Sequence, residues 1–458
     1  MNYVHFIGIG GAGMSGLAEI LVARGVRVSG SDLAASDKTA QLKKLGVHIF
    51  IGHDAKHLAK AVDTVVYSSA IAVTNPEFTE ASNRGIPLIR RAEFLGTLTQ
   101  DLKTIAVAGT HGKTTTTSMI AHILIEAGLD PLVSVGASVK ELQGKNARPG
   151  NGTVAIVEAD EYDRSFLALK PYIAVVTTLE AEHLDIYKDL EDLQQTFVQF
   201  ANNTNEHHQL GYAVVNIDEP AVRSILSKFT QRLVSFGIRS PEAKYRAIGV
   251  EVNGFRTTAD ILRGNEPIGK LTLNIAGEHN VKNALAAIAV VEILAIPFDL
   301  TLRALATFKG AERRLDVVGE KQGVLVIDDY AHHPTEVRAT LSTLKAGFPR
   351  RRIIAAFQPH TFTRTRDFAE EFGRVFAEYS DELYLLDIYP ARERPIKGIT
   401  SALILDAAKE LGMRKAVYVP NLEVLPKVLT TNRRNGDIII TMGAGSITEA
   451  APEILRSL

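Results

Sequence analysis

One short stretch of the sequence, 109–115 (Gly-Thr-His-Gly-Lys-Thr-Thr), has the residue types that bind phosphate groups. Its glycines let backbone N–H groups turn toward phosphate oxygens, Lys113 can reach the β- and γ-phosphates, and Thr114 can hold Mg²⁺. An apolar run, 104–108, precedes it and a helical pattern follows. The spacing is shorter than G-x-x-x-x-G-K-[ST], because Val107 stands where the first glycine would be. A glycine turn with a solvated lysine is the alternative, but the flanking strand and helix favour a nucleotide-binding loop. The cofactor-binding candidates here are Gly109, Thr110, His111, Gly112, Lys113, Thr114 and Thr115.

A second glycine motif lies near the N-terminus and satisfies G-x-G-x-x-G after the apolar run 4–9. Asp32 closes the next apolar run, at the spacing of an acid that binds a ribose. The same geometry suits a dinucleotide, the pyrophosphate of a UDP-sugar, or simply the close packing of a helix on a sheet. The motif alone leaves these three interpretations open. Its glycines are Gly8, Gly10, Gly11 and Gly13.

Two acidic clusters, 158–161 (Glu-Ala-Asp-Glu) and 180–185 (Glu-Ala-Glu-His-Leu-Asp), each follow an apolar strand-like run. Open α/β sheets bind ligands at the carboxyl ends of their strands, so we expect both clusters to lie near the phosphate loop. Carboxylates suit Mg²⁺, and an imidazole can complete a second, looser site. The alternative is that these are exposed acidic loops.

Basic and histidine-rich motifs gather in the last third of the chain, at 313–316, 328–334 and 358–366. An arginine fork binds phosphate or carboxylate through two hydrogen bonds, and histidines can donate to a transferring phosphoryl group. Structural histidines are more common than catalytic ones, but the repeated pairing of strand ends with His and Arg favours an anion site.

The order of apolar runs and amphipathic segments predicts an α/β fold of three domains: N-terminal Rossmann-like, central P-loop ATPase-type sheet, and C-terminal Rossmann-like. We place the domains at 1–102, 103–310 and 311–458. Strand-like runs at 154–157, 173–178 and 214–216 extend the central sheet, and glycine-punctuated runs over 236–275 predict an antiparallel flap.

The composition excludes several classes of protein. The chain has 458 residues, with 51 basic and 52 acidic side chains and a net charge of −1, so no overall field favours nucleic acid or an anionic membrane. The absence of cysteine excludes disulfides, thiolate metal sites and a cysteine nucleophile. The N-terminus does not read as a signal peptide, and the longest apolar stretch, 284–298, is too short to span a bilayer. We expect a cytoplasmic protein, monomeric or weakly dimeric.

Taken together, the motifs GIGGAGMSG, AVAGTHGKTTTT, EADEYD, EAEHLD, GEHNVKNALAA, RRLD, DDYAHHPTE and QPHTFTRTRD resemble those of the Mur ligase family along nearly the whole chain. The resemblance implies an ATP- and Mg²⁺-dependent amide ligase that joins L-alanine to the lactyl carboxylate of UDP-N-acetylmuramate through an acyl phosphate, the first stem-peptide step of peptidoglycan synthesis. It also changes the interpretation of the first glycine motif from a dinucleotide to a UDP-sugar.

The resemblance implies a role for each matching residue. Thr114, Glu158 and His183 would bind metal, and Asn280, Asn283, Arg314 and Asp329 would contact ATP. The UDP-sugar would contact the four N-terminal glycines with Ser31, Asp32, Ser68, Ser69 and Arg91. Tyr330 and Arg364 would bind substrate, while Lys113, His332, His360 and Arg364 would act at the reacting groups.

Three departures from the family pattern bear on these roles. Several members carry a lysine about a dozen residues past the position of His183, and this chain has Gln195-Thr196-Phe197-Val198 there, as expected of an alanine-adding member. Tyr162 stands where many such members have serine, and Thr361 where some have arginine. Arg364 and Arg366 are therefore both candidates for binding the amino-acid carboxylate.

Alternative functions are separated by these same motifs. A recycling ligase of the family would attach the L-Ala-γ-D-Glu-diaminopimelate tripeptide to the same UDP-sugar. A folylpolyglutamate-type ligase would lack the first glycine motif, a Rossmann dehydrogenase would leave the phosphate loop unexplained, and a nucleotide-gated binding protein would not need the acidic and His/Arg clusters.

Overall fold

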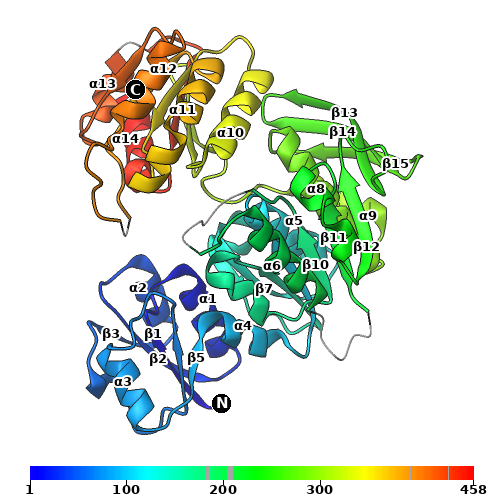
Figure 1. Ribbon diagram of the computed structural model, residues 1–458, viewed down its shortest axis with the longest axis vertical. Coiled ribbons are helices and arrows are strands. Elements are labelled where there is room, and N and C mark those ends of the chain that lie inside the picture. Colours follow the sequence, from blue (N-terminus) through cyan, green and yellow to red (C-terminus); the bar gives the residue numbers. More distant parts are fainter. Residues whose placement is uncertain (181–185, 204–209, 392, 432) are drawn as a thin grey trace. The chain divides into compact units, whose positions relative to one another are not determined.

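The computed structural model describes residues 1–180, 186–203, 210–391, 393–431 and 433–458. Three β-sheets with flanking helices follow one another along the chain (Figure 1). The predicted three-part α/β fold is therefore confirmed. Among the residues described, no helix combines the length and apolar character that a membrane span needs.

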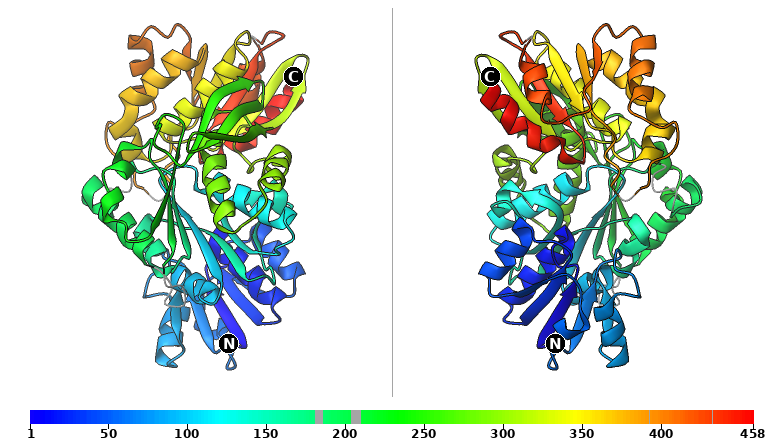
Figure 2. Two further views of the ribbon diagram at one scale, coloured as in Figure 1. Left: turned by 90° about the vertical axis from the view of Figure 1, so that its right-hand side faces the viewer. Right: turned by 90° about the vertical axis from the view of Figure 1, so that its left-hand side faces the viewer.

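The first sheet is parallel and has the strand order β3-β2-β1-β4-β5. Helices lie on both of its faces (Figure 2), because alternate residues of β1 join different cores: Val4 and Phe6 pack with Leu17 of α1, whereas Tyr3 and Ile7 pack with Ala81 of α3. The order reverses between β1 and β4, which is where such sheets bind ligands. The elements are β1 (Tyr3–Ile7), α1 (Ala12–Ala23), β2 (Arg27–Asp32), α2 (Asp37–Lys44), β3 (His48–Ile51), β4 (Thr64–Tyr67), α3 (Pro76–Asn83), β5 (Leu88–Arg90) and α4 (Arg91–Thr99).

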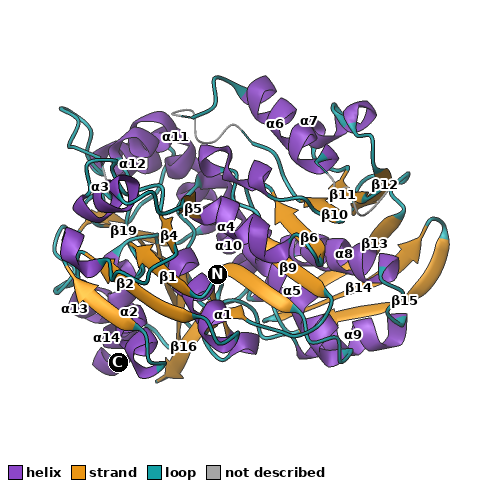
Figure 3. Ribbon diagram, turned by 90° about the horizontal axis from the view of Figure 1, so that it is seen from below, coloured by secondary structure: helices purple, strands orange, loops and turns teal. Residues whose placement is uncertain are grey.

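The second sheet has ten strands, in the order β15-β14-β13-β12-β11-β10-β6-β9-β7-β8. The strand before the phosphate loop, β6, lies between β9 and β10 and is parallel to both. The helix after the loop, α5, packs along β6, β7 and β9 (Figure 3). The strands up to this point are β6 (Lys103–Ala108), β7 (Leu132–Val139), β8 (Lys145–Arg148), β9 (Val154–Glu158), β10 (Ile173–Val176), β11 (Tyr212–Asn216) and β12 (Arg232–Gly237). The helices are α5 (Lys113–Glu126), α6 (Leu190–Asn202), α7 (Pro220–Arg223), α8 (Glu278–Ile293) and α9 (Phe298–Thr307).

The predicted flap comprises β13 (Tyr245–Asn253), β14 (Arg256–Arg263) and β15 (Glu266–Leu273) at one edge of this sheet. Two-residue connections join these neighbouring strands, which only antiparallel hairpins allow. Gly254 and Gly264 have positive φ, as tight hairpin turns require. The expectation that the flap begins at Phe236 is wrong, because Phe236 belongs to β12, which pairs in parallel with β11.

The third sheet has the order β16-β17-β21-β18-β19-β20, with only β16 antiparallel to its neighbour. Both of its faces are buried, against two separate apolar cores. Its strands are β16 (Asp316–Lys321), β17 (Val324–Asp329), β18 (Ile353–Phe357), β19 (Glu382–Leu385), β20 (Ala416–Tyr418) and β21 (Ile438–Met442). Its helices are α10 (Pro334–Gly347), α11 (Phe362–Tyr379), α12 (Ala402–Glu410), α13 (Leu425–Thr431) and α14 (Ala450–Ser457).

The chain forms two compact units. Unit 1 comprises 1–249, 259–271 and 282–310, and unit 2 comprises 250–258, 272–281 and 311–458. The first two sheets thus belong largely to unit 1 and the third to unit 2. The three domain boundaries expected from the sequence stay a prediction.

Candidate active site

The phosphate loop of unit 1 has a backbone that only glycine accommodates at two positions. Gly109 and Gly112 have φ of 141° and 82°. A Cβ on Gly109 would lie 2.0 Å from Thr177 Oγ1, and one on Gly112 would lie 2.6 Å from Asn283 Oδ1. The two glycines therefore allow the loop to pack against the end of β10 on one side and against α8 on the other.

The loop is fixed to the chain that follows β10. The Thr178 carbonyl accepts a hydrogen bond from Thr110 N at 3.0 Å, and Thr178 Oγ1 accepts one from His111 N at 2.8 Å. No side chain among the described residues caps the N-terminus of α5, which begins after Gly112. The first N–H groups of a helix have no partner within the helix, so this end can receive an anion.

Lys113 is held within the loop by two contacts of its ammonium group. Its Nζ donates to the Gly109 carbonyl at 2.6 Å and forms an ion pair of 2.8 Å with Glu161 Oε1. Burial opposes the charge on Lys113, but its attraction to Glu161 outweighs burial and raises the pKa of Lys113. The lysine is therefore protonated at neutral pH and can bind phosphate oxygens.

Thr114 and Glu158 place two oxygen donors side by side at the start of α5. Thr114 Oγ1 donates to Glu158 Oε2 at 3.0 Å, and Gly136 N donates to the same oxygen at 2.8 Å. A Cβ on Gly136 would lie 2.7 Å from Glu158 Oε1, so glycine is needed for this approach. Burial raises the pKa of Glu158 despite nearby Lys113. A cation at this carboxylate would relieve that cost.

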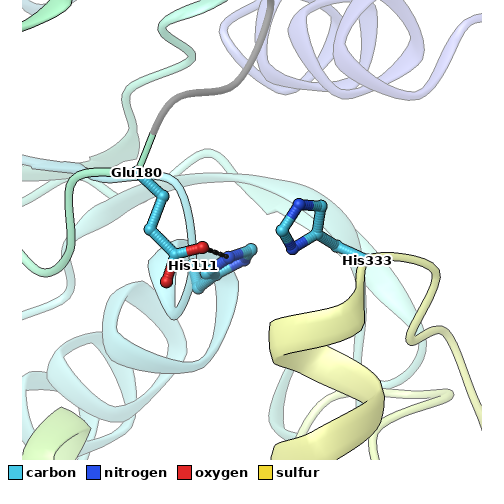
Figure 4. Close-up of side chains that lie close together, drawn as sticks. All are labelled: His111, Glu180 and His333. Carbon is cyan, nitrogen blue, oxygen red and sulfur yellow. Dashed lines mark hydrogen bonds and ion pairs between the residues drawn. The ribbon is translucent and has the colours of Figure 1, made fainter. Parts of the chain in front are cut away.

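The loop histidine, His111, faces the second acidic cluster. Its Nε2 lies 3.4 Å from Glu180 Oε2, and Figure 4 shows the ring turned toward that carboxylate. The other predicted member of this cluster, His183, lies outside the described residues. Asn283 also lies beside the loop, where its Oδ1 accepts a hydrogen bond from Thr116 Oγ1 at 3.2 Å.

Gly112→Ala is expected to weaken ATP turnover and to destabilise the protein by about 1–2 kcal/mol from the left-handed backbone alone, with a further cost from the contact with Asn283. The checks are the KM for ATP and the Tm. Gly128→Ala is the matched control, because Gly128 follows the other end of α5 with φ of 76° and has nothing within 4 Å of its added Cβ. An equal Tm loss in both variants, with normal ATP turnover in Gly112→Ala, would contradict the prediction.

The N-terminal glycine loop joins β1 to α1 and is tied to the end of β2. Gly8 N and Ile9 N donate to the Ser31 carbonyl at 2.8 and 3.0 Å, and Gly10 N donates to Asp32 Oδ2 at 2.7 Å. A Cβ on Gly10 would lie 2.8 Å from that same oxygen. The structure thus brings the predicted glycines, Ser31 and Asp32 together at the reversal of strand order.

Two of the remaining predicted residues of this edge, Ser68 and Arg91, lie beside glycines of the loop. Ser68 follows β4, and its Oγ would lie 3.7 Å from a Cβ on Gly8, while Ser69 is exposed. Arg91 lies against Gly13, whose added Cβ would be 2.9 Å from Arg91 Nη1. Arg91 Nη2 is also 3.6 Å from Asp160 Oδ2 in the first acidic cluster.

In unit 2, Asp329 ends β17 as a buried carboxylate. Its oxygens accept hydrogen bonds from Leu315 N at 2.7 Å and Ala331 N at 2.8 Å. Burial raises the pKa of Asp329 to about 6, against the attraction of Arg314. Arg314 Nη1 lies 3.5 Å from Glu336 Oε1, and its guanidinium carbon lies 5.6 Å from the centre of the Tyr330 ring. Asn280 also lies in unit 2, where its Nδ2 donates to the Ala276 carbonyl at 2.8 Å.

His332, His360 and Arg364 form a second group in unit 2. The two imidazole centres are 5.5 Å apart, and Arg364 Nη1 lies 3.3 Å from His360 Nδ1. Burial lowers the pKa of His332 to about 3, and burial and Arg364 lower that of His360 to about 4. Both rings are therefore neutral at pH 7. Arg366, by contrast, is paired with Asp367 at 2.6 Å and half exposed.

The hydrogen-bond partners of the neutral His332 and His360 rings indicate which nitrogen of each ring carries the proton. Arginine can only donate, so His360 Nδ1 accepts and its proton lies on Nε2. His332 Nδ1 lies 3.0 Å from the Tyr330 carbonyl and 3.2 Å from Glu336 Oε2, so it donates and its Nε2 is an acceptor. His360 thus presents a donor and His332 an acceptor.

The lowered pKa of His360 predicts a pH-dependent loss of stability. Below about pH 6.5 the unfolded chain binds a proton at His360 that the folded chain does not bind until about pH 4. Stability is therefore lost as the pH falls through this window, by on the order of 1–3 kcal/mol. His360→Gln should lose less Tm than the unaltered protein between pH 7.5 and 4.5. The exposed His48→Gln serves as control, and parallel Tm curves for all three proteins would refute the prediction.

Several residues of these sites had no role assigned from the sequence. Glu161 lies in the first acidic cluster, but its pairing with Lys113 depends on the turn after β9. Glu336 ends the motif DDYAHHPTE, but the motif assigned it no role, while Thr178 and Gly136 belong to no motif and act through single contacts. Glu77 lies outside every motif of the sequence.

Three sequence families match consecutive parts of the chain. Residues 3–103 match the family described as "Mur ligase family, catalytic domain", 107–291 match "Mur ligase middle domain", and 313–445 match "Mur ligase, glutamate ligase domain". Together they cover most of the sequence.

Relatives match over the full length. A UDP-N-acetylmuramate–L-alanine ligase of Anaeromyxobacter sp. (strain Fw109-5) is 46% identical over 455 residues, covering 99% of this chain and 97% of the relative. The solved UDP-N-acetylmuramate–alanine ligase of Thermotoga maritima superposes with a TM-score of 0.84 at 29% identity, covering 100% and 99% of the two chains. A murein peptide ligase of Psychrobacter arcticus gives 0.71 at 25% identity, covering 100% and 98%. The chain therefore belongs to the Mur ligase family.

Proposed function

We propose that this protein is an ATP-dependent amide ligase that joins L-alanine to the lactyl carboxylate of UDP-N-acetylmuramate. The observation that carries the proposal is the phosphate loop, with Lys113 and the Thr114–Glu158 pair, in a chain that aligns end to end with alanine ligases. Those relatives favour alanine addition over tripeptide recycling, and the Thermotoga maritima structure superposes with a higher TM-score than the murein peptide ligase of Psychrobacter arcticus.

The phosphate loop would hold the triphosphate of ATP. The uncapped start of α5 offers N–H groups, and Lys113, already protonated, exchanges its contact with the Gly109 carbonyl for phosphate oxygens. The γ-phosphoryl group is transferred to the lactyl carboxylate, giving an acyl phosphate and ADP. Such a transfer needs chiefly alignment and neutralisation of charge, which Lys113 supplies here and Arg314 of unit 2 is proposed to supplement. No protein nucleophile is required.

Thr114 and Glu158 fit a magnesium ion. Both offer oxygen, which Mg²⁺ prefers, and the raised pKa of Glu158 indicates a carboxylate whose charge is incompletely compensated. Mg²⁺ would neutralise phosphate charge when bound. His183 is proposed as a ligand of a second ion, and Asn280, Asn283 and Asp329 as contacts of the nucleoside.

The edge of the first sheet would bind the sugar nucleotide. The glycine loop places backbone N–H groups at the start of α1, which suits a pyrophosphate, and Arg91 lies within the same unit between that helix and Asp160. Asp32 Oδ2 accepts a hydrogen bond from Gly10 N, so Asp32 shapes the loop. A carboxylate can accept several hydrogen bonds, so Asp32 can also accept from the sugar nucleotide. Ser68 and Ser69 complete the proposed contacts.

The amino acid would bind in unit 2. Arg364 is the better candidate for its carboxylate, because Arg366 is already paired with Asp367 on the surface. Tyr330 would pack against the amino acid. His332 Nε2 would accept a hydrogen bond from the attacking amine, and His360 Nε2–H would donate to the acyl group. The neutral amine nitrogen attacks the acyl carbon, the C–O bond to phosphate breaks, and inorganic phosphate leaves with the proton that the nitrogen loses.

The test is whether ADP formation requires both UDP-N-acetylmuramate and L-alanine. We expect turnover only when both are present with Mg²⁺. ADP formed without an amine would favour a nucleotide-gated binding protein, and a change in NADH fluorescence on mixing would favour a dehydrogenase.

The proposed substrates also bear on where in the cell the protein works. ATP and UDP-sugars are metabolites of the cytoplasm, so we propose that the protein acts there, as a monomer or weak homodimer. We also propose that residues 1–102, 103–310 and 311–458 divide the binding of UDP-sugar, ATP and amino acid among them.

A further inference from the structure

A carboxylate with no role in the reaction described above lies buried beneath the glycine loop edge of the first sheet. Glu77, on the first turn of α3, is 0% exposed. Asn75 caps the helix, and its Oδ1 accepts from Glu77 N at 2.9 Å, which fixes the backbone of Glu77. Burying a carboxylate costs free energy unless it is well hydrogen-bonded, so the hydrogen-bond partners of Glu77 indicate what its side chain does.

Hydrogen-bond partners from three separate segments converge on this carboxylate. Ser31 Oγ donates to Glu77 Oε2 at 2.5 Å, and His5 Nε2 lies 3.2 Å from the same oxygen. His57 Nδ1 lies 2.8 Å from Oε1, and Asp54 N donates to Oε1 at 3.2 Å. Glu77 therefore ties β1, the end of β2 and the segment after β3 to α3.

The carboxylate is ionised within this network. Burial acts to raise its pKa, but hydrogen bonds from His5, Ser31 and His57 outweigh burial and lower the pKa of Glu77 to about 2. The hydrogen bonds it accepts are thus charge-assisted, and these are roughly twice as strong as neutral ones.

Ser31 connects this network to the glycine loop. Its carbonyl accepts from Gly8 N and Ile9 N, while its hydroxyl gives its single proton to Glu77. Because that proton is used, Ser31 Oγ must accept from His53 Nδ1, 3.0 Å away. Ser31 therefore binds the glycine loop through its backbone carbonyl and is itself held by Glu77 through its side chain.

We propose that Glu77 is a positioning residue for the sugar nucleotide: held by three segments, it fixes Ser31 and His53 and thereby the glycine loop at the edge of the first sheet. This inference rests on the proposed function, since it assigns the loop to the UDP-sugar. A merely structural role would lower the Tm without selecting one substrate.

The experiment compares Glu77→Gln with the unaltered protein in steady-state kinetics. The amide keeps the shape of the side chain but removes its charge and one acceptor. We expect the KM for UDP-N-acetylmuramate to rise by about 10- to 100-fold, while the KM values for ATP and L-alanine and the value of kcat stay within about threefold. Glu80→Gln, on the same helix and outside the network, is the matched control. An unchanged KM for the UDP-sugar, or an equal rise for all three substrates, would overturn the inference.

A double-mutant cycle tests the route through Ser31. If Glu77 acts by holding Ser31, then Ser31→Ala and Glu77→Gln together should raise the KM for the UDP-sugar hardly more than the worse single variant. Effects that multiply would show that Glu77 acts independently of Ser31, against the proposal.

If Glu77→Gln does not fold, judged by its Tm, His57→Gln takes its place, because His57 is partly exposed and supplies only one of the hydrogen bonds to Glu77. It should raise the same KM by a few-fold, and no change would overturn the inference. Failure of the proposed function is distinguishable, because the unaltered protein would then show no turnover dependent on the UDP-sugar.

Discussion

Lys113→Ala should lower ATP turnover by about 1,000-fold while binding of UDP-N-acetylmuramate is retained. The lysine is the charged group of the phosphate loop, and its ammonium is already held by the Gly109 carbonyl and Glu161. Its loss removes charge neutralisation from a transition state that depends on it. The sugar nucleotide is proposed to bind at a different sheet, where Lys113 makes no contact. Turnover is measured by ADP formation, and binding of the UDP-sugar by titration calorimetry.

Two controls make this result interpretable. Lys103→Ala removes a lysine from the start of the strand that leads into the loop, at an exposed position, and should leave both measurements close to the unaltered protein. Because Glu161 would lose its buried cation in Lys113→Ala, Lys113→Ala with Glu161→Gln separates loss of chemistry from loss of stability. Normal turnover in Lys113→Ala would refute the phosphate-loop assignment. Loss of UDP-sugar binding together with a normal Tm would refute the separation of the two sites.

Glu158→Gln is expected to have the second largest effect, raising the Mg²⁺ concentration for half-maximal turnover by at least about tenfold. The amide can still accept the hydrogen bonds from Thr114 and Gly136, so the local structure should survive. What is lost is the negative charge beside the phosphate loop. The measurement is a Mg²⁺ titration of ADP formation at saturating ATP.

Glu191→Gln, at an exposed position on α6, provides a matched change of charge in the same unit. Its Mg²⁺ titration should be that of the unaltered protein. If Glu158→Gln also shows an unchanged titration, Glu158 does not bind the metal. A lower kcat at every Mg²⁺ concentration, with no shift in the titration, would likewise contradict the proposed site.

The main strands were predictable because parallel sheets buried on both faces leave long apolar runs in the sequence, as in β6, β9 and β21. The strands β3 and β5 were missed for a physical reason. They are short and lie at the edges of their sheet, with their side chains half-buried or exposed, so they lack the long apolar runs of strands that are buried on both faces. The start of the flap was misplaced because β12 ends at Gly237, shortly before β13 begins at Tyr245, and its parallel pairing with β11 leaves no signal in the sequence.

The candidate sites could be predicted where a motif fixes both residue type and backbone geometry. The phosphate loop and the N-terminal glycine loop are such cases, since Gly8, Gly109 and Gly112 all adopt positive φ. Contacts between distant segments could not be predicted. The pair Lys113–Glu161 joins residues 48 positions apart, and Ser31–Glu77 joins residues 46 apart. Only the folded sheets bring these groups together.

The most direct test of the central claim is the identity of the product. ATP, Mg²⁺ and UDP-N-acetylmuramate are supplied with L-alanine, with the L-Ala-γ-D-Glu-diaminopimelate tripeptide, or with no acceptor, and the products are analysed by mass spectrometry. The account predicts UDP-N-acetylmuramoyl-L-alanine, with one phosphate released for each amide formed, in the first reaction only. Formation of the tripeptide conjugate instead would contradict it and assign the protein to recycling.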